Sequence, residues 1–225
     1  MQPVIQTGGP ALALIFDMDG VIVDSNPAHR EAWTAFNRRY GLETTEDMHH
    51  RMYGRRNDQI VRDFYGESLT DEEVTARGAA KEQLYREMVA AAIYDMLVPG
   101  IREFLGDNAT CPMALATNGE RANVDFLLEK AGLRSRFSVI IDGHQVQHPK
   151  PDPEIYLLAA SQLKVDPSNC IVFEDSYTGV SAALAAGMRV VGIRTTHGNL
   201  PGTSITVDNF RSGELTSWLA AQSRV

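Results

Sequence analysis

The chain has 225 residues, of which 44% are hydrophobic and 22% charged, an ordinary composition for a globular protein with a sizeable core. The formal net charge of -8 disfavours nucleic acid and anionic membranes as partners, and no apolar run approaches the roughly 18 residues that a membrane-spanning helix needs. The N-terminal residues lack the basic and apolar regions of a secretory signal, and Cys111 and Cys170 lie beside or inside apolar runs. We therefore expect a cytoplasmic protein with buried free thiols, and we expect it to be a monomer.

The first predicted element is a strand over residues 12–16, "LALIF", whose continuous apolar run suits a strand that is buried on both faces. Two carboxylates, Asp17 and Asp19, follow it directly, and Gly20 lets the chain turn sharply. Carboxylates this close repel each other unless a positive charge lies between them. The pair therefore either caps a turn or holds a cation and takes part in chemistry.

Residues 25–96 have a helical pattern throughout, and no strand-like run interrupts it. This segment contains nine of the chain's seventeen arginines. Pro99 and Gly100 follow it and mark the return to an α/β pattern. We predict an all-helical insertion at residues 25–96 and an α/β core formed by residues 1–24 and 97–225, with the first nine residues as a loose tail.

The remainder of the chain alternates strand-like and helix-like segments. Predicted strands lie at residues 113–116, 138–141, 170–173 and 189–193, with a weaker one at 204–207. Predicted helices lie at residues 120–133, 152–163 and 178–187. This alternation predicts an α/β protein with a Rossmann-like parallel sheet, helices on both faces in three layers, and a site at the carboxyl ends of the strands.

A second acidic pair, Glu174 and Asp175, follows the predicted strand 170–173. The carboxyl ends of adjacent parallel strands meet at one edge of a sheet, so we expect both acidic pairs to lie there. Four carboxylates in one place are costly without a cation, and Mg²⁺ prefers oxygen ligands. The sequence therefore predicts a Mg²⁺ site at Asp17, Asp19, Glu174 and Asp175, whereas either pair alone is equally compatible with a helix N-cap or a turn.

Two further positions complete a set suited to phosphate chemistry. Thr117 and Asn118 follow the strand 113–116, where a hydroxyl and free backbone N–H groups can bind phosphoryl oxygens. Lys150, one of only four lysines, lies between two prolines after the strand 138–141. Taken singly, the threonine suits an N-cap and the lysine a solvated surface. Beside an acidic edge, Lys150 becomes a counter-charge for phosphate and carboxylate.

The order of these motifs resembles the haloacid-dehalogenase superfamily of phosphotransferases. The motifs are D-x-D-G at 17–20, T-N at 117–118, K-P-x-P at 150–153 and E-D-S-x-x-G at 174–179, and the resemblance runs from Leu12 to about Arg194. "FEDSYTGVSAALAAGM" and "HPKPDPEIYLLAA" are similar to the branch that contains β-phosphoglucomutase and small sugar-phosphate phosphatases. That branch carries a helical cap after the first strand, which matches residues 25–96.

The resemblance implies a role for each motif residue. Asp17 would be the nucleophile that forms an aspartyl-phosphate, and Asp19 the general acid and base, which also lends its backbone carbonyl to the metal. Lys150 would neutralise Asp17 and the transferring phosphate. Thr117 and the Asn118 amide would bind the phosphoryl group. The Mg²⁺ site would be completed by Glu174 and Asp175.

The resemblance also suggests substrate-binding residues in the predicted cap. His29 and Lys81 match a histidine and a lysine that help hold the sugar and gate the acid/base aspartate in β-phosphoglucomutase. Where that mutase has an arginine for the distal phosphate, this chain has Asn57, with Arg56 one place earlier. A one-residue shift would let Arg56 or Arg55 serve, and a solvated charged surface is the alternative for all of these positions. Arg121 is a further phosphate-binding candidate.

Three functions fit these residues to different degrees. The first is a Mg²⁺-dependent phosphatase that hydrolyses a small phosphorylated metabolite, a sugar or polyol phosphate, through an aspartyl-phosphate. The second is a phosphomutase of the β-phosphoglucomutase type, in which a sugar hydroxyl captures the phosphoryl group. The third, a receiver-like signalling phospho-acceptor, is opposed by the 25–96 insertion and by Asp19. The presence of Asp19 also argues against a true dehalogenase, which lacks that second aspartate.

Two histidine pairs in the sequence suggest a transition-metal site, namely His49 with His50 and His144 with His148. The sequence shows no third ligand at a suitable spacing from either pair, so we interpret these residues as exposed loop histidines.

Overall fold

The computed structural model describes residues 12–222, and the predicted N-terminal tail lies outside that range. The described residues form one sheet of six parallel strands in the order β3-β2-β1-β4-β5-β6. The strands are β1 (Ala13–Phe16), β2 (Met113–Ala116), β3 (Val139–Ile141), β4 (Cys170–Glu174), β5 (Arg189–Ile193) and β6 (Ile205–Val207). The chain order reverses direction at β1, so the site expected from the sequence lies where β1 has neighbours on both sides.

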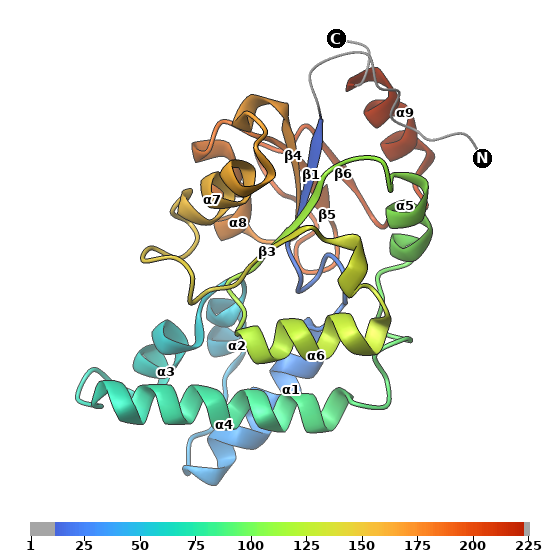
Figure 1. Ribbon diagram of the computed structural model, residues 1–225. Helices are drawn as coiled ribbons and strands as arrows, with labels where there is room; N and C mark the ends of the chain where they lie inside the picture. Colours follow the sequence, from blue (N-terminus) through green and yellow to red (C-terminus); the bar gives the residue numbers. More distant parts are fainter. Residues whose placement is uncertain (1–11, 223–225) are drawn as a thin grey trace.

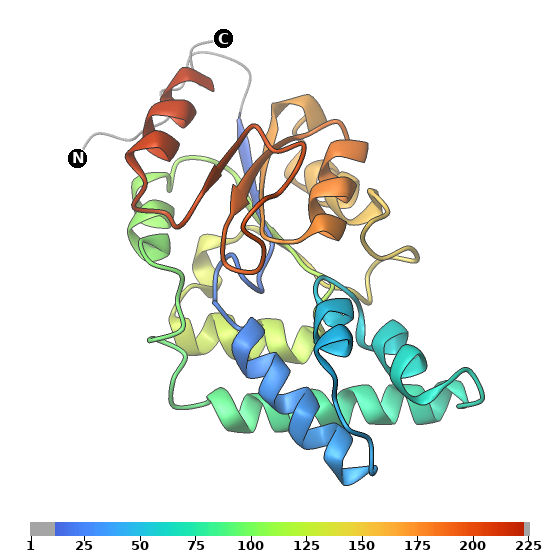
Figure 2. The same ribbon diagram turned by 180° about the vertical axis from the view of Figure 1, so that it is seen from behind.

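Helices cover both faces of the sheet (Figures 1 and 2). These helices are α5 (Ile101–Asp107), α6 (Arg121–Ala131), α7 (Glu154–Leu163), α8 (Tyr177–Ala185) and α9 (Gly213–Gln222). Short 3₁₀ turns lie at Arg134–Arg136 and Pro167–Asn169. One apolar cluster joins α5, α6 and α9 to the sheet, and a second joins α7 and α8 to its other face. The layers are therefore helix, sheet and helix, as the sequence predicts.

Side chains of β1 point alternately to the two faces of the sheet and pack into a different apolar cluster on each face, which is why every position of the strand is apolar. Leu14 and Phe16 belong to the cluster under α5, α6 and α9, whereas Ala13 and Ile15 belong to the cluster under α7 and α8. The ring of Phe16 stacks on that of Phe173 in β4, with centroids 4.6 Å apart. A strand buried on both faces has no polar face, and its first polar side chains come where it ends.

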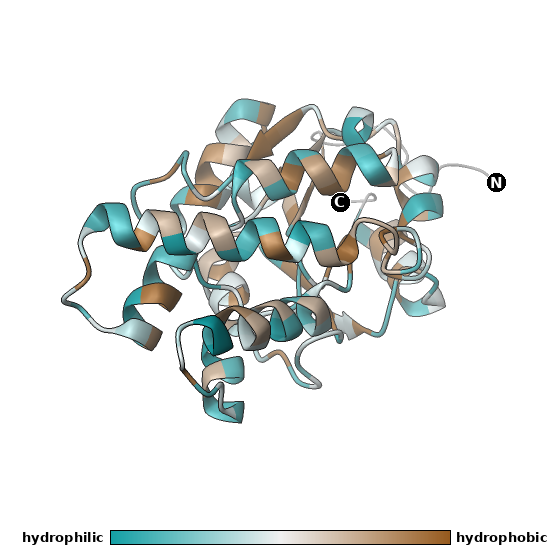
Figure 3. Ribbon diagram, turned by 90° about the horizontal axis from the view of Figure 1, so that it is seen from below, coloured by the Kyte–Doolittle hydropathy of each residue, from teal (hydrophilic) through white to brown (hydrophobic). Residues whose placement is uncertain are grey.

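The segment predicted as an insertion contains four helices, which lie together beyond the carboxyl ends of the strands (Figures 1 and 2). They are α1 (Asn26–Arg39), α2 (Glu46–Met52), α3 (Asn57–Tyr65) and α4 (Asp71–Val89). They have an apolar cluster of their own, which includes Trp33, Phe36, Ile60 and Val74. In Figure 3 hydrophilic and hydrophobic residues both occur along each helix, as expected for helices with one buried face.

Two connecting segments lead into and out of these helices and lie side by side. Val23 and Leu97 form an antiparallel bridge, and the N–H of Asp24 donates to the carbonyl of Met96 at 2.7 Å. The pairing falls beside the predicted boundaries at 24/25 and 96/97. The division into a cap and a core remains a prediction, and we use "cap" for residues 25–96.

The predicted strands and helices agree with the structure to within about two residues at most ends. Pro153 is the residue before the first turn of α7 and not part of that turn. Gly132 ends α6 in the left-handed conformation, with a φ of 65°. Across residues 12–222, no helix combines the length and apolar character needed to cross a membrane.

Candidate active site at the carboxyl ends of the strands

The carboxyl ends of three neighbouring strands carry the predicted motif residues. Asp17 follows β1, Thr117 follows β2, and Glu174 is the last residue of β4. The chain turns after Asp19 at Gly20, whose φ is 76°, and a Cβ there would overlap the carboxylate of Asp175. Glycine thus allows the first acidic motif to approach the second closely.

Lys150 lies at the centre of this group and is fully buried. Its Nζ atom is 2.7 Å from Asp17 Oδ1 and 2.7 Å from Glu174 Oε1, and it also donates to the carbonyl of Ala116 at 3.0 Å. Burial opposes the charged form of this ammonium, but the two carboxylates outweigh it and raise the pKa of Lys150. The side chain is therefore a fixed positive charge.

Glu174 is held by hydrogen bonds on both of its oxygens. Oε1 accepts from Lys150 Nζ and from the hydroxyl of Tyr156 at 2.8 Å. Oε2 accepts from the N–H groups of Asp175 and Ser176 and from the Ser176 hydroxyl, at 2.9 to 3.0 Å. Burial acts to raise the pKa of Glu174, but Lys150 outweighs it and leaves the pKa lowered. With five donors already around it, Glu174 is suited to positioning Lys150.

At Asp17 and Asp175 the neighbouring groups do not offset the effect of burial on the pKa. Burial raises the pKa of Asp17 to about 7 against the opposing charge of Lys150, and Glu174 and Asp19 add to the rise. Burial, together with the charges of Glu174 and Asp17, raises the pKa of Asp175 well above its ordinary value. Oxygens of Asp17, Glu174 and Asp175 lie within 4.8 Å of one another. Three carboxylates and one ammonium leave a deficit of positive charge, and an all-oxygen set of this kind suits Mg²⁺.

Asp19 is held from the cap side. Its Oδ1 accepts from the Ser25 hydroxyl at 2.5 Å and lies 3.4 Å from His29 Nε2. Lys81 Nζ is 3.0 Å from His29 Nδ1, and because an ammonium only donates, His29 accepts at Nδ1 and presents Nε2–H to Asp19. Burial acts to raise the pKa of Asp19, but these bonds, with His29 foremost, outweigh it and lower the pKa.

Thr117 and Asn118 lie between the strand ends and the cap. The Thr117 hydroxyl accepts from the N–H of Gly119 at 3.0 Å. The Asn118 side chain donates to the carbonyl of Gly54 in the cap at 2.8 Å and accepts from the N–H of Lys150 at 3.3 Å. Both residues line a cleft between α1–α4 and the strand ends, together with Asp17, Asp19 and Lys150.

The arginines predicted to bind phosphate lie elsewhere. The Arg56 guanidinium pairs with both oxygens of Asp58 and donates to the carbonyl of Gly143 at 3.1 Å, and Arg56 is not among the residues that line the cleft. Arg121 is 47% exposed at its side chain and pairs with Asp125 at 2.8 Å, also outside the cleft lining. The structure therefore does not bring Arg56 or Arg121 to the cleft.

Arg55, the remaining arginine predicted as a candidate for binding the distal phosphate, does line the cleft. Its guanidinium, however, donates to Asp63 at 2.9 Å and to the carbonyls of Arg51 and Gln59. Asn57 also lines the cleft, where its side-chain amide donates to Glu82 at 2.8 Å and to Glu120 at 3.1 Å. Each of these two candidates is already bonded to neighbouring cap or core groups.

A family model for haloacid dehalogenase-like hydrolases matches residues 12–187. The match contains all of the strand-end motifs described above and the whole of α1–α4. The chain belongs to this haloacid dehalogenase-like hydrolase family.

Several proteins similar to this hydrolase have names that refer to phosphorylated sugars. It is 35% identical over 182 residues to fructose-1-phosphate phosphatase from Escherichia coli K12, covering 80% of this chain and 95% of that protein. It is 31% identical over 193 residues to β-phosphoglucomutase from Bacillus subtilis 168, covering 80% and 82%. Among solved structures, β-phosphoglucomutase from Clostridium difficile superposes with a TM-score of 0.83 at 26% identity, covering 94% of this chain and 98% of that one.

Some residues that hold the hydrolase's site were not predicted from the sequence. Asn26 and Thr196 donate to Asp175 Oδ2, Tyr156 holds Glu174, and the ring of Tyr85 stacks on His29 with centroids 3.8 Å apart. Tyr156 and Tyr85 lie in helices with apolar patterns, where an aromatic residue is interpreted as part of the hydrophobic core. Only the position of Asn26 beside the predicted start of a helix gives a signal in the sequence.

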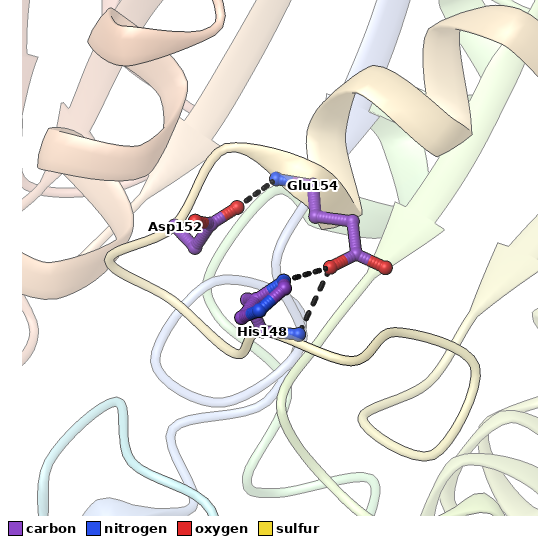
Figure 4. Close-up of side chains that lie close together, drawn as sticks. All are labelled: His148, Asp152 and Glu154. Atoms are coloured by element: carbon purple, nitrogen blue, oxygen red, sulfur yellow. Dashed lines mark hydrogen bonds and ion pairs between the residues drawn. The ribbon is translucent and has the colours of Figure 1, made fainter.

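A second group of possible metal ligands lies at the start of α7 (Figure 4). His144 and His148 are exposed loop residues, as the sequence predicts, and Asp152 and Glu154 lie beside His148. The same prediction is wrong for His49 and His50, which lie in α2, where His49 is buried. Glu154 Oε2 accepts from Nδ1 and the N–H of His148, both at 2.9 Å, and Asp152 Oδ1 accepts from the N–H of Glu154. These contacts shape the turn into α7, and His148 is exposed.

Proposed function

We propose that this protein is a Mg²⁺-dependent phosphatase that hydrolyses a small phosphorylated metabolite, a sugar or polyol phosphate, through an aspartyl-phosphate on Asp17. The observation that carries the proposal is the buried contact between Lys150 and Asp17 beside two further carboxylates at the ends of β1 and β4. A fixed ammonium beside a carboxylate at a strand end suits phosphoryl transfer, in which charge on the transferring group must be neutralised.

The reaction has two displacements on phosphorus. In the first, Asp17 attacks and forms an acyl-phosphate bond, while the ester P–O bond breaks and the leaving oxygen takes a proton from the protonated form of Asp19. That form is the minor one in the free protein, because His29 and Ser25 lower the pKa of Asp19. In the second, a water molecule attacks the phosphorus of the intermediate and gives a proton to Asp19, which releases inorganic phosphate and restores the Asp17 carboxylate. Because Lys150 occupies Oδ1 of Asp17, Oδ2 is the atom free to attack.

Mg²⁺ would be held by the carboxylates of Asp17 and Asp175 and by the main-chain oxygen of Asp19. When bound, it would supply positive charge for the developing charge on the phosphoryl oxygens. The raised pKa values of Asp17 and Asp175 support these two as ligands, since each carboxylate gains most from a cation. Glu174 belongs to the same cluster, but its five hydrogen bonds favour a role in holding Lys150.

The lining of the cleft supports a polar substrate. Asn57, Lys81 and Glu82 supply polar groups from the cap, and Asn123 supplies one from α6. The relative named fructose-1-phosphate phosphatase acts on a substrate of this kind.

The second candidate is a phosphomutase of the β-phosphoglucomutase type. It is favoured by the relative from Bacillus subtilis and by the structure from Clostridium difficile, both of which carry that name. A mutase and a phosphatase share the strand-end residues and differ in whether a sugar hydroxyl or water captures the phosphoryl group.

³¹P NMR with Mg²⁺ tests the proposal against this alternative. A panel of sugar phosphates would include fructose 1-phosphate and β-glucose 1-phosphate, the latter with a trace of glucose 1,6-bisphosphate. Growth of inorganic phosphate is the expected result. Growth of glucose 6-phosphate without free phosphate would contradict the phosphatase and establish the mutase.

A further inference from the structure

A closed set of three hydrogen bonds joins the cap to Asp175, one of the carboxylates proposed to hold Mg²⁺. The hydroxyl of Thr196, in the loop between β5 and β6, donates to Asp175 Oδ2. The side-chain amide of Asn26 donates to the same oxygen at 3.1 Å and to Thr196 Oγ1 at 2.5 Å. Asn26 is the first residue of α1, so its two bonds cross from the cap to the core.

Both donors act on one oxygen of Asp175. Among residues 12–222 no hydrogen bond is made to the other oxygen, Oδ1, which leaves that atom available to coordinate a cation. Burial raises the pKa of Asp175 most strongly, and the Thr196 hydroxyl acts in the opposite direction because it stabilises the ionised form. Hydrogen bonds to a ligand carboxylate also fix its orientation and increase its affinity for a metal.

The residue after Thr196 makes a second contact with the cap. The ring of His197 lies edge-on to that of Tyr53, the residue that follows α2, with centroids 5.9 Å apart. It also stacks on the ring of Tyr177 at the start of α8, with centroids 4.1 Å apart. The cap therefore contacts the loop that carries Thr196 in two places, through Asn26 and through Tyr53.

We propose that Asn26, together with Thr196, is a positioning residue that makes the Mg²⁺ affinity of Asp175 depend on the position of the cap. If the cap moves away from the strand ends, Asn26 moves with α1, and Asp175 loses one of its two donors. Coupling of this kind is reciprocal, so bound Mg²⁺ should in turn favour the cap position described here. The inference rests on the Mg²⁺ site of the proposed function and adds two residues that the proposed reaction does not use.

Calorimetric titration of MgCl₂ into the full-length protein without substrate tests the two positioning residues. Thr196→Val keeps the size of the side chain and removes the hydroxyl, so the Kd for Mg²⁺ should rise about tenfold. Thr196→Ser restores the hydroxyl and should restore the Kd. Asn26→Ala should raise the Kd by a smaller factor, about threefold, because the Thr196 hydroxyl remains.

Thr203→Val is the matched control. Thr203 lies in the same connection between β5 and β6, and its described hydrogen bonds go only to the carbonyl of Leu200 and the hydroxyl of Thr206. It should leave the Kd for Mg²⁺ unchanged. A Kd that changes in neither Thr196→Val nor Asn26→Ala, or that changes equally in Thr203→Val, would overturn the positioning role.

A double-mutant cycle separates coupling to the cap from a local effect on Asp175. Arg56→Met removes a contact between the cap and the carbonyl of Gly143, and Arg56 makes no described contact with Asp175. In the wild-type background it should raise the Kd for Mg²⁺ about threefold, and in Asn26→Ala it should have little effect. If Arg56→Met has no effect in the wild-type background, or the same effect in both backgrounds, the coupling is wrong.

Failure of this inference can be distinguished from failure of the proposed function. A wild-type protein that binds Mg²⁺ and hydrolyses sugar phosphates, with a Kd that neither Asn26→Ala nor Thr196→Val alters, contradicts the inference alone. A wild-type protein that Mg²⁺ neither binds nor stabilises contradicts the Mg²⁺ site, and with it both the inference and the proposed function.

Discussion

Asp17 and Asp19 are separated by one residue, yet their surroundings move their pKa values in opposite directions. Burial raises the pKa of Asp17 to about 7, whereas the hydrogen bonds of His29 and Ser25 overcome burial and lower the pKa of Asp19. A nucleophile must be ionised, and a carboxyl with a pKa near 7 is only about half ionised at neutral pH, so a cation beyond Lys150 would increase the fraction of Asp17 that can act as the proposed nucleophile. This difference explains why the site's residues favour a metal-dependent reaction.

The raised pKa of Asp17 predicts how Mg²⁺ binding depends on pH. The ordinary pKa is 3.8, so between about pH 4 and pH 7 Asp17 binds more protons in the folded, metal-free protein than in the unfolded chain. The contribution of Asp17 to the free energy of unfolding should therefore fall as pH rises through this window. Mg²⁺ binds the ionised form, so the increase in melting temperature that Mg²⁺ produces should grow from about pH 5 to about pH 8.

Thermal unfolding by differential scanning calorimetry, with Mg²⁺ and with a chelator, measures this increase. Asp17→Asn, which cannot ionise at this position, is the control and should show a smaller increase that depends less on pH, with the remaining dependence coming from Asp175. An effect of Mg²⁺ that is equal at both ends of the range in the wild-type protein would count against Asp17 as a ligand.

Replacing the nucleophile gives the second prediction at this scale. Asp17→Asn keeps the size of the side chain and can still accept from Lys150, so the fold should persist while kcat falls by roughly 10⁴-fold or more. Steady-state kinetics on the best substrate and circular dichroism measure the two effects. Retained turnover in a folded variant would make the nucleophile assignment wrong.

The strand-end residues were predictable from the sequence, and the partners of the arginines were not. Asp17, Thr117 and Glu174 follow apolar runs, so parallel packing alone brings them to one edge. Arg56 was predicted to bind phosphate, but Asp58, two residues away, holds its guanidinium. Competition among surface ion pairs depends on side-chain geometry that periodicity does not encode.

At the scale of elements, the start of α8 determines the position of Glu174. The Ser176 hydroxyl accepts from the N–H of Gly179 at 3.1 Å and so caps the helix, while it also donates to Glu174. A Cβ at Gly179 would overlap the Glu174 carboxylate. The glycine therefore allows the first turn of α8 to pack directly on the buried charge cluster.

Two glycine substitutions test this packing. Gly179→Ala should destabilise the protein by about 1–3 kcal/mol, because the helix or Glu174 must move. Gly106→Ala in α5 is the matched control, since nothing lies within 4 Å of a Cβ there, and it should be neutral or stabilising by up to about 1 kcal/mol. Urea unfolding measures both changes. Equal effects of the two substitutions would contradict the close packing of α8 on Glu174.

Element prediction succeeded where a pattern was continuous. The six predicted strands correspond to β1–β6, and the three predicted core helices to α6, α7 and α8. The helices α5 and α9 were not predicted. Residues such as Phe104 and Leu215 anchor these helices in the main apolar cluster, so tertiary packing contributes more to them than local pattern does.

At the scale of the whole molecule, the cap and the strand ends are joined by a few polar contacts across the cleft. The Gly54 carbonyl accepts from Asn118, and Arg56 donates to the carbonyl of Gly143 after β3. Asn123 on α6 also donates to Glu82 on α4. We expect these contacts to hold the cap against the strand ends and so to limit the access of water to the proposed reaction.

The prediction for the whole molecule concerns Arg56, whose guanidinium joins the cap to the carbonyl of Gly143. Arg56→Met should weaken closure of the cap and lower kcat/KM about tenfold for all substrates alike. Arg51→Met is the control, because Arg51 pairs with Asp47 and Asp63 inside the cap, and it should change kcat/KM little. Steady-state kinetics on a mono- and a bisphosphate measure both variants. A loss confined to the bisphosphate would instead support the original interpretation of Arg56 as a phosphate-binding residue.

The most direct test of the account is to trap the phosphoryl group on the protein. Asp19→Asn should slow attack by water on the intermediate, so a short incubation with Mg²⁺ and a phosphate ester with a good leaving group should leave phosphoenzyme. Peptide mass spectrometry should then find one phosphoryl group on the peptide that contains Asp17, and none in Asp17→Asn. Release of inorganic phosphate by the wild-type protein with no such adduct in Asp19→Asn, or with the adduct on another residue, would contradict the central claim.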